Sequence, residues 1–236
     1  MKLASFDLEI AAVVPETVRE WSKVKGLGIS CAAVALSDKD EIEVWQGIPR
    51  LEKSKCIDVA ERLAELCDQG YTLITWNGCS FDFRVLAEES GLLKRCGQLA
   101  LNHVDFMLIV TFTKGHYLSL QAALQGAGLS GKLTRVRLSS GREIRDMDGS
   151  KAPALWAAGE HEAVLAYLKD DVVQLLKLAQ VVSRRGRISW TSRSGKPQEV
   201  RLSQLLTVTE CFGIPEPDTS WMSDPPRRTQ FTDWIK

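Results

Sequence analysis

Two acidic side chains, Asp7 and Glu9, stand two positions apart in an otherwise apolar segment near the N-terminus. The segment, residues 3–10, has the length and apolar character of a β-strand. Side chains two apart on a strand point to the same face, so both carboxylates would lie side by side. Neighbouring carboxylates repel each other and lose hydration on burial, and a bound divalent cation commonly offsets that cost. The alternative interpretation is an edge strand that shows both acids to water.

A second acidic position, Asp82, follows a predicted strand over residues 71–76. It ends the run Asn-Gly-Cys-Ser-Phe-Asp at residues 77–82, where we expect a loop and then the first turn of a helix. We expect Ser80 to be the N-cap of that helix. The helix macrodipole favours a carboxylate in the first turn, so Asp82 also has a purely structural interpretation.

A third acidic position, Asp171, lies in the longest helical pattern of the chain, residues 160–182. Tyr167 precedes it by four residues, so both side chains lie on one face of the helix. Beside that face runs the apolar stripe that we expect to meet the core. Its members are Val164, Leu168, Val172, Leu175 and Ala179. The alternative interpretation is an exposed tyrosine beside two surface acids, Asp170 and Asp171.

In this order, the three stretches resemble the DEDD exonucleases of the ribonuclease-H-like superfamily, in the branch that carries a tyrosine. The motifs are Asp-x-Glu on the first strand, Asn-x-x-x-Phe-Asp after a middle strand and Tyr-x-x-x-Asp on a late helix. The second motif is most similar to that of the proofreading exonuclease domain of family B DNA polymerases and its stand-alone relatives. The other branch has histidine five residues before the last acid, where this chain has Ala166. The resemblance covers residues 1–182.

The resemblance implies that four acids, Asp7, Glu9, Asp82 and Asp171, ligate two divalent metals, Mg²⁺ or Mn²⁺. It implies that Tyr167 orients the attacking water, and that single-stranded DNA or RNA is hydrolysed from its 3′ end to nucleoside 5′-monophosphates. Carboxylate oxygens suit such cations, and two of them supply both water activation and charge stabilisation. Two alternatives stay open: a structure-specific endonuclease or RNase with the same metal site, and a catalytically silent nucleic-acid-binding module.

Four residues near these motifs have less defined roles. Asp170 adjoins Asp171 and is a candidate secondary acid, although the spacing favours Asp171. Asp105 matches an acid often found after the second motif in such folds, and we expect a structural or supporting role for it. Asn77 either positions the nucleic-acid strand or holds its loop, and Phe81 is a further candidate substrate contact.

The composition is that of an ordinary globular protein. The chain has 236 residues, with 30 basic and 30 acidic side chains, enough for one large domain or two small ones. We expect no membrane segment, because no apolar run approaches the ~20 residues of a membrane helix. The 6 cysteines form no Cys-x-x-Cys pair, which favours reduced thiols in a cytoplasmic protein. Walker-type, Gly-x-Ser-x-Gly and zinc-spaced motifs are missing from the sequence.

Two segments are locally basic although the net charge is zero. Residues 183–201 contain 6 basic side chains against 1 acid, and residues 129–151 contain 6 against 3. From these segments we take Arg135, Arg137 and Arg185 as candidate phosphate contacts. Trp190 is a candidate for base stacking. The alternative is a solvated face for the arginines and a core position for the tryptophan.

These elements predict an α/β fold: a ribonuclease-H-like, mixed five-stranded sheet flanked by helices, with a C-terminal hairpin and tail. The first three strands, near residues 3–10, 27–36 and 41–46, have connections that favour an antiparallel meander. Residues 11–25 form an insertion between the first two strands, with a short helix as a candidate element. Further expected elements are helices over 58–69, 117–126 and 203–212, a strand within 102–107, an extended excursion over 129–151 and a hairpin of 187–191 with 198–202. We expect residues 1–182 to form the exonuclease domain and residues 183–236 a basic, aromatic extension packed on it.

Overall fold

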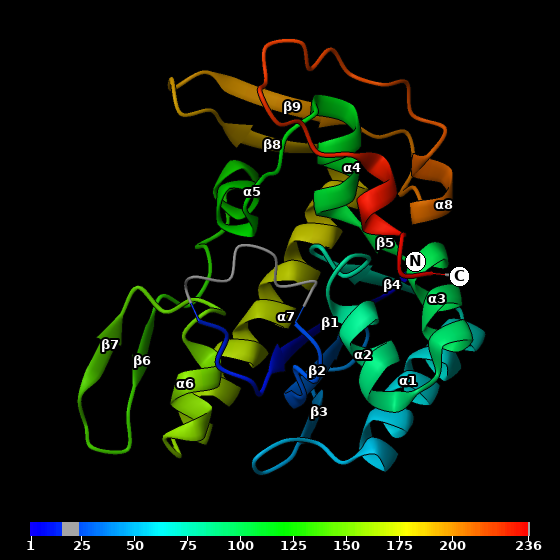
Figure 1. Ribbon diagram of the computed structural model, residues 1–236. Helices are drawn as coiled ribbons and strands as arrows, with labels where there is room; N and C mark the ends of the chain where they lie inside the picture. The colour runs from blue at the N-terminus through cyan, green and yellow to red at the C-terminus, as the bar shows by residue number, and fades with distance from the viewer. Residues whose placement is uncertain (16–23, 236) are drawn as a thin grey trace.

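One five-stranded sheet with helices on both faces organises the computed structural model, which describes residues 1–15 and 24–235 (Figure 1). Its strands are β1 (Lys2–Ile10), β2 (Ile29–Leu36), β3 (Ile42–Gln46), β4 (Tyr71–Thr75) and β5 (Val104–Asp105). The order across the sheet is β3-β2-β1-β4-β5. The pairs β1–β2 and β2–β3 are antiparallel, whereas β1–β4 and β4–β5 are parallel. The predicted mixed sheet and its N-terminal meander are therefore confirmed; much of the predicted insertion lies outside the described residues.

Strand β1 is the middle strand, and its two faces have different roles. Phe6 packs against Phe83 of helix α2 (Asp82–Ser90), with ring centroids 5.7 Å apart. Ser5 points to the other face, where its hydroxyl donates to the Val172 carbonyl at 2.6 Å. Because side chains alternate along a strand, Asp7 shares the face of Ser5. That face is covered by the long helix α7 (His161–Arg185).

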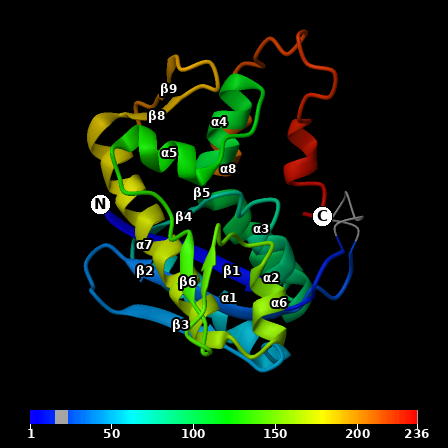
Figure 2. The same ribbon diagram turned by 90° about the vertical axis from the view of Figure 1, so that its left-hand side faces the viewer.

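Helix α7 lies along this face of the sheet (Figures 1 and 2). All five predicted stripe residues are buried, so that prediction is confirmed. Small side chains on β2, Ala33 and Ala35, belong to the same apolar cluster as this helix and allow it to pack closely on the sheet. The interpretation of Tyr167 and Asp171 as exposed side chains is wrong, because they are only 1% and 3% exposed.

The opposite face of the sheet is covered by α1 (Lys53–Asp68), α2 and α3 (Leu93–Asn102). Their apolar residues share one core cluster with Phe6 and Leu8. The parallel pairing of β1 with β4 ends at Ser5 and Ile74. Beyond that point the edge of β1 is free of β4, which leaves room for the start of α2 beside Leu8.

A second group of elements lies beyond the end of the sheet (Figure 2). It contains α4 (Phe106–Lys114), α5 (Leu120–Ala127), α8 (Val208–Cys211), the 3-10 helix η2 (Arg228–Phe231) and the hairpin of β8 (Arg187–Thr191) with β9 (Pro197–Arg201). The hairpin was predicted. Helix α5 packs so closely on β8 at Gly126 that a Cβ there would lie 1.8 Å from the Ser189 carbonyl oxygen. The tail folds back: Phe231 is buried, and the Trp234 indole donates to the Cys79 carbonyl at 2.8 Å.

Several predicted elements differ from the observed ones. Ser80 does not cap α2, whose N-cap is Phe81; the Ser80 hydroxyl donates to the Asn77 side chain at 2.6 Å. The strand within 102–107 is two residues long, and the unpredicted helix α4 follows it at once. The excursion over 129–151 contains a small hairpin, β6 (Arg135–Arg137) with β7 (Glu143–Arg145), before helix α6 (Ala152–Ala157).

Candidate functional site

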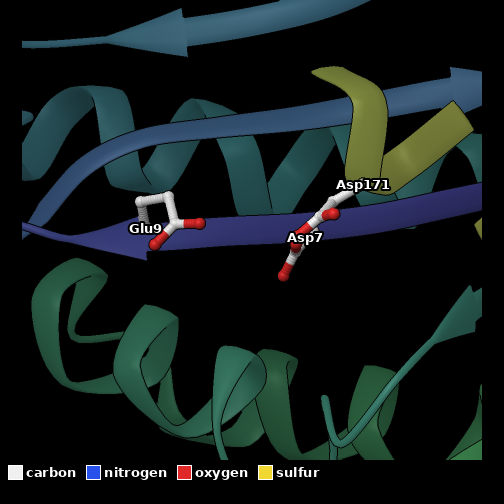
Figure 3. A group of neighbouring side chains, drawn as sticks. All are labelled: Asp7, Glu9 and Asp171. Carbon is white, nitrogen blue, oxygen red and sulfur yellow. The ribbon is translucent and has the colours of Figure 1, made fainter. Parts of the chain in front are cut away.

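Three carboxylates from distant parts of the chain meet beside strand β1. Asp7 and Glu9 come from β1 and Asp171 from α7 (Figure 3). Each side chain can offer an oxygen such that all three oxygens lie within 4.8 Å of one another. Glu9 and Asp171 are buried and Asp7 is half-buried. This spacing allows all three to bind one cation or a pair of neighbouring cations.

Asp82 adjoins this group from the other helix layer. Its Oδ1 accepts a hydrogen bond from the Leu8 backbone N–H at 3.1 Å. Its carboxyl group is also hydrogen-bonded to that of Asp7. Asp82 can reach β1 because it begins helix α2, and α2 starts beyond the point where β4 stops pairing with β1. The structure therefore brings together all four acids that the motifs single out.

Burial and mutual repulsion make these carboxyl groups difficult to ionise. Burial first, and then the negative charge of its neighbours, raises the pKa of Glu9 well above its usual range. Burial and the adjacent Asp7 do the same to the pKa of Asp82. Burial raises the pKa of Asp171 to about 7, although Lys132 opposes this shift. A cluster of this kind is stabilised by added positive charge.

The donor set fits a divalent metal. Among the described residues, the Oδ1 atom of Asp171 is buried and has no hydrogen-bond partner. An unpartnered buried carboxylate oxygen costs free energy, and a cation is a natural partner for it. All four side chains offer hard oxygen ligands, which Mg²⁺ and Mn²⁺ prefer.

A lysine that the motif analysis did not single out also enters the site. The Nζ of Lys132 lies 2.7 Å from Oδ2 of Asp171 and 2.7 Å from the hydroxyl oxygen of Tyr167. In the sequence, Lys132 is one of the basic side chains of residues 129–151. No spacing to the acidic motifs could have revealed it, because its position depends on how the loop before β6 folds back on α7.

Two side chains fix the loop that carries Lys132. The backbone N–H of Lys132 donates to Oε1 of Gln121 at 2.8 Å. The backbone N–H of Leu133 donates to Oδ2 of Asp170 at 2.7 Å. Gly131 has a φ of +89°, and a Cβ there would lie 2.6 Å from the Gln121 side chain. Asp170 thus holds the loop, while its neighbour Asp171 lies in the carboxylate cluster.

Tyr167 is a hydrogen-bonding group of the cluster. A lysine ammonium has no acceptor, so the Tyr167 oxygen accepts the bond from Lys132. Tyr167 is also hydrogen-bonded to Asp171, and it must be the donor to that carboxylate. Burial and the nearby carboxylates raise the pKa of Tyr167 far above its usual range. The protonated form of the hydroxyl is therefore favoured, and in that form it can donate a hydrogen bond.

Comparison with known families agrees with this geometry. A family profile described as the RNase H superfamily matches residues 25–183. The chain belongs to the RNase H superfamily. The matched residues include Asp82, Tyr167 and Asp171, and Asp7 and Glu9 precede them. No curated protein matches the sequence significantly.

Membership of this superfamily supports a nuclease that hydrolyses nucleic acid, and the acidic cluster supports metal dependence. Within the described residues, no helix has the length and apolarity that crossing a bilayer requires.

Asp105 organises the loop that leads to Asp82. Its carboxylate accepts hydrogen bonds from three backbone N–H groups, of Asn77 at 2.9 Å, Cys79 at 3.0 Å and Leu108 at 3.1 Å. Asn77 has a φ of +73°, a conformation that this anchoring helps to maintain. The role of Asp105 in this RNase H superfamily fold is therefore structural.

The predicted substrate contacts lie in three places. Asn77 and Phe81 lie in the loop before Asp82 and are half-buried. Arg135 and Arg137 are exposed on β6, and Val136 between them packs in the same apolar cluster as Tyr167.

The other two predicted contacts belong to the C-terminal elements. Arg185 is exposed and donates to the Ala127 carbonyl at the end of α5, at 3.0 Å. Trp190 is 5% exposed and packs in the core, with its ring 6.2 Å from that of His116. These contacts place both residues in the packing of the hairpin and α5.

Proposed function

We propose that the protein is a metal-dependent 3′→5′ exonuclease that removes nucleoside 5′-monophosphates from single-stranded nucleic acid. The observation that carries this proposal is the meeting of Asp7, Glu9 and Asp171, with Asp82 hydrogen-bonded to Asp7, in an RNase H superfamily fold. The direction and the product rest on the resemblance of the ordered motifs to the tyrosine-bearing DEDD exonucleases.

The four carboxylates would hold two divalent cations, Mg²⁺ or Mn²⁺. Two such cations, when bound, lower the pKa of a water molecule and stabilise the charge that develops on the phosphate. The unpartnered Oδ1 of Asp171 gives this assignment a structural basis, because the oxygen is buried and ready to accept a ligand bond.

Tyr167 and Lys132 would position the reactants. The protonated Tyr167 hydroxyl lies beside Asp171 and can orient the attacking water. Lys132 holds that hydroxyl through its own hydrogen bond and leaves one positive charge at the edge of the cluster. The ammonium group is also placed to attract the phosphate that approaches the carboxylates.

For the substrate, we propose that Asn77 and Phe81 contact the terminal nucleotide, because their loop leads directly to Asp82. Arg135 and Arg137 are proposed to contact phosphates, since both are exposed on a strand that packs beside Tyr167. Arg185 and Trp190, which are engaged within the fold, would support the substrate site by holding α5 and the hairpin.

The proposal is tested with end-labelled DNA and RNA strands of both polarities, incubated with Mg²⁺, Mn²⁺ or EDTA. We expect a 5′-labelled strand to shorten one nucleotide at a time with metal, and no cleavage with EDTA. A covalently closed single-stranded circle should stay intact, and its cleavage would favour the endonuclease instead. Binding of the strands without hydrolysis under every metal condition would favour the silent binding module.

A further inference from the structure

An aromatic groove of about 850 Å³ lies between α5, the β8–β9 hairpin and the C-terminal tail. Tyr117, Trp190 and Trp221 supply its aromatic lining. Tyr117 is 52% exposed and Trp221 is 68% exposed, whereas Trp190 forms a buried floor. Large exposed aromatic side chains around one groove are typical of a binding surface.

Trp221 is anchored although its ring is exposed. Its indole N–H donates to the Asp218 carbonyl at 3.2 Å, so the polar edge is satisfied while most of the ring remains accessible. Tyr117 is also fixed, because its hydroxyl is hydrogen-bonded to the Gln230 side chain and its ring lies 6.2 Å from that of Phe231. Both rings can therefore accept a flat ligand with little loss of conformational freedom.

The charge of the groove suits an anionic ligand. Arg193 is the one arginine or lysine that lines it, and no aspartate or glutamate does. In the hairpin, Arg187 and Arg201 pair with Glu199. Within the described residues, Arg193 and Lys196 in the turn form no ion pair. Two cations are therefore available to phosphate groups.

One residue, Tyr117, connects this groove with the surroundings of the loop before Asp82. Tyr117 also lines a second hollow of about 650 Å³, which extends to Asn77 and Ser80. Those two residues belong to the loop that leads to Asp82. Acidic and basic side chains are mixed along this hollow, as in the contact between Arg84 and Asp233 at 3.8 Å. Stacking, rather than charge, would therefore dominate binding along this path.

We infer that the aromatic groove binds unpaired bases of a single-stranded nucleic acid, several nucleotides away from the end that enters the catalytic site. Trp221 and Tyr117 would stack on the bases, and Arg193 would contact a phosphate. Bases in a duplex are already stacked on each other, so this surface selects single strands. We place these bases on the 5′ side of the cleaved 3′ end, and this placement rests on the proposed function.

The binding itself is tested without catalysis. A 5′-fluorescein-labelled dT₁₂ strand is titrated with protein in EDTA, and anisotropy gives the Kd. We expect Trp221→Ala to weaken binding by about tenfold, as stacking predicts, and Tyr117→Ala to weaken it by a similar factor. Trp221→Phe should keep most of the affinity. Ile48→Ala, at an apolar side chain that is 74% exposed elsewhere, is the matched control and should have no effect.

Salt dependence and strand type provide further criteria. The single phosphate contact assigned to Arg193 predicts a slope of log K against log salt of about −0.7. A dT₁₂ Kd unchanged in both alanine variants, or equal affinity for a duplex, would overturn the inference. Thermal melting checks that each variant is folded.

Hydrolysis separates this inference from the proposed function. With Mn²⁺, Trp221→Ala should degrade a trinucleotide at the parent rate but lose about tenfold in kcat/KM on dT₁₂. If the parent hydrolyses nothing but binds dT₁₂ through Trp221, the proposed function fails and the binding surface stands. If the parent hydrolyses both substrates and the variant is equally active on both, the binding surface fails and the proposed function stands.

Discussion

The Nζ of Lys132 lies 2.7 Å from Oδ2 of Asp171, within a cluster of four acidic side chains. The ammonium group lies near Asp7 and Glu9 as well, and it opposes the rise in pKa that burial causes in both carboxyl groups. One built-in positive charge thus offsets part of the repulsion that four buried acids create.

Lys132→Met tests this relationship. Without the ammonium group, the carboxylates lose their internal cation and Tyr167 loses the donor that holds its hydroxyl. We expect a lower Tm in EDTA, a larger rise of Tm on addition of Mn²⁺, and a fall in kcat on the order of 10- to 100-fold. Differential scanning fluorimetry and nuclease assays measure these effects.

Lys169→Met is the matched control, because Lys169 is exposed on the same helix as Asp171. It should leave both the Tm and the kcat unchanged. Equal Tm values for Lys132→Met and the parent in EDTA would contradict the charge-balancing role of Lys132.

Asp7→Asn should separate stability from activity. Burial raises the pKa of Asp7, so the metal-free fold favours its protonated form. Its contribution to stability is therefore greatest at low pH and is lost as the pH rises through the raised pKa. Asparagine removes that cost, so we expect a higher Tm than the parent in EDTA at neutral pH.

The same substitution should reduce the Mn²⁺-induced rise of Tm and lower activity by on the order of 10³-fold. Asp58→Asn, at an exposed position on α1, is the control that changes neither quantity. An active Asp7→Asn protein would be incompatible with the proposed site.

Asp105→Ala should destabilise the fold without removing a ligand. Three backbone N–H groups would lose their buried acceptor, at a cost of about 3 kcal/mol in the free energy of unfolding. Asp105→Asn keeps one acceptor oxygen and should lose less. Urea unfolding measures both, with the exposed Asp40→Ala as control. A stable Asp105→Ala protein would show that the loop is held by other contacts.

His103 should make the folded state sensitive to acid. Burial lowers the pKa of His103 to about 4, although the Ala100 carbonyl, 2.8 Å from Nδ1, opposes this shift. The other ring nitrogen lies 2.8 Å from the Thr75 hydroxyl. As the pH falls below about 6.5, His103 binds a proton in the unfolded chain but stays neutral in the folded chain. The contribution of His103 to the free energy of unfolding is therefore fully present above pH 6.5 and is lost as the pH falls towards 4. About 2 kcal/mol is lost by pH 5.

Urea unfolding in EDTA at pH 7.5 and pH 5.0 measures this loss, with His103→Gln as the non-titrating variant. The difference between parent and variant isolates His103 from the carboxylates, whose raised pKa values act in the opposite direction. The same change with pH in both proteins would contradict the assignment.

Patterns with a regular period gave reliable predictions of the fold. The apolar character of β1 and the apolar stripe of α7 are local properties, and both elements form where those patterns predict. Helix α4 was missed because its residues, from Phe106 onward, are almost uniformly apolar and carry no helical period. Ser80 was wrongly chosen as a cap because its hydroxyl bonds to Asn77 instead.

The candidate site was predictable to the extent that its residues lie in motifs. Asp7, Glu9, Asp82 and Asp171 are found from spacing and order, and the structure brings them together. Lys132 could not be found in this way, since it reaches Asp171 through a loop held by Gln121 and Asp170. Contacts of that kind depend on tertiary structure, and no short sequence period encodes them.

The most direct test of the metal centre is a Mn²⁺ titration followed by electron paramagnetic resonance, which detects the free ion. We predict that the parent protein removes up to two Mn²⁺ ions per chain from solution, and that Asp7→Asn and Asp171→Asn remove fewer. Free Mn²⁺ that rises identically with the parent, with the variants and with no protein would contradict the account.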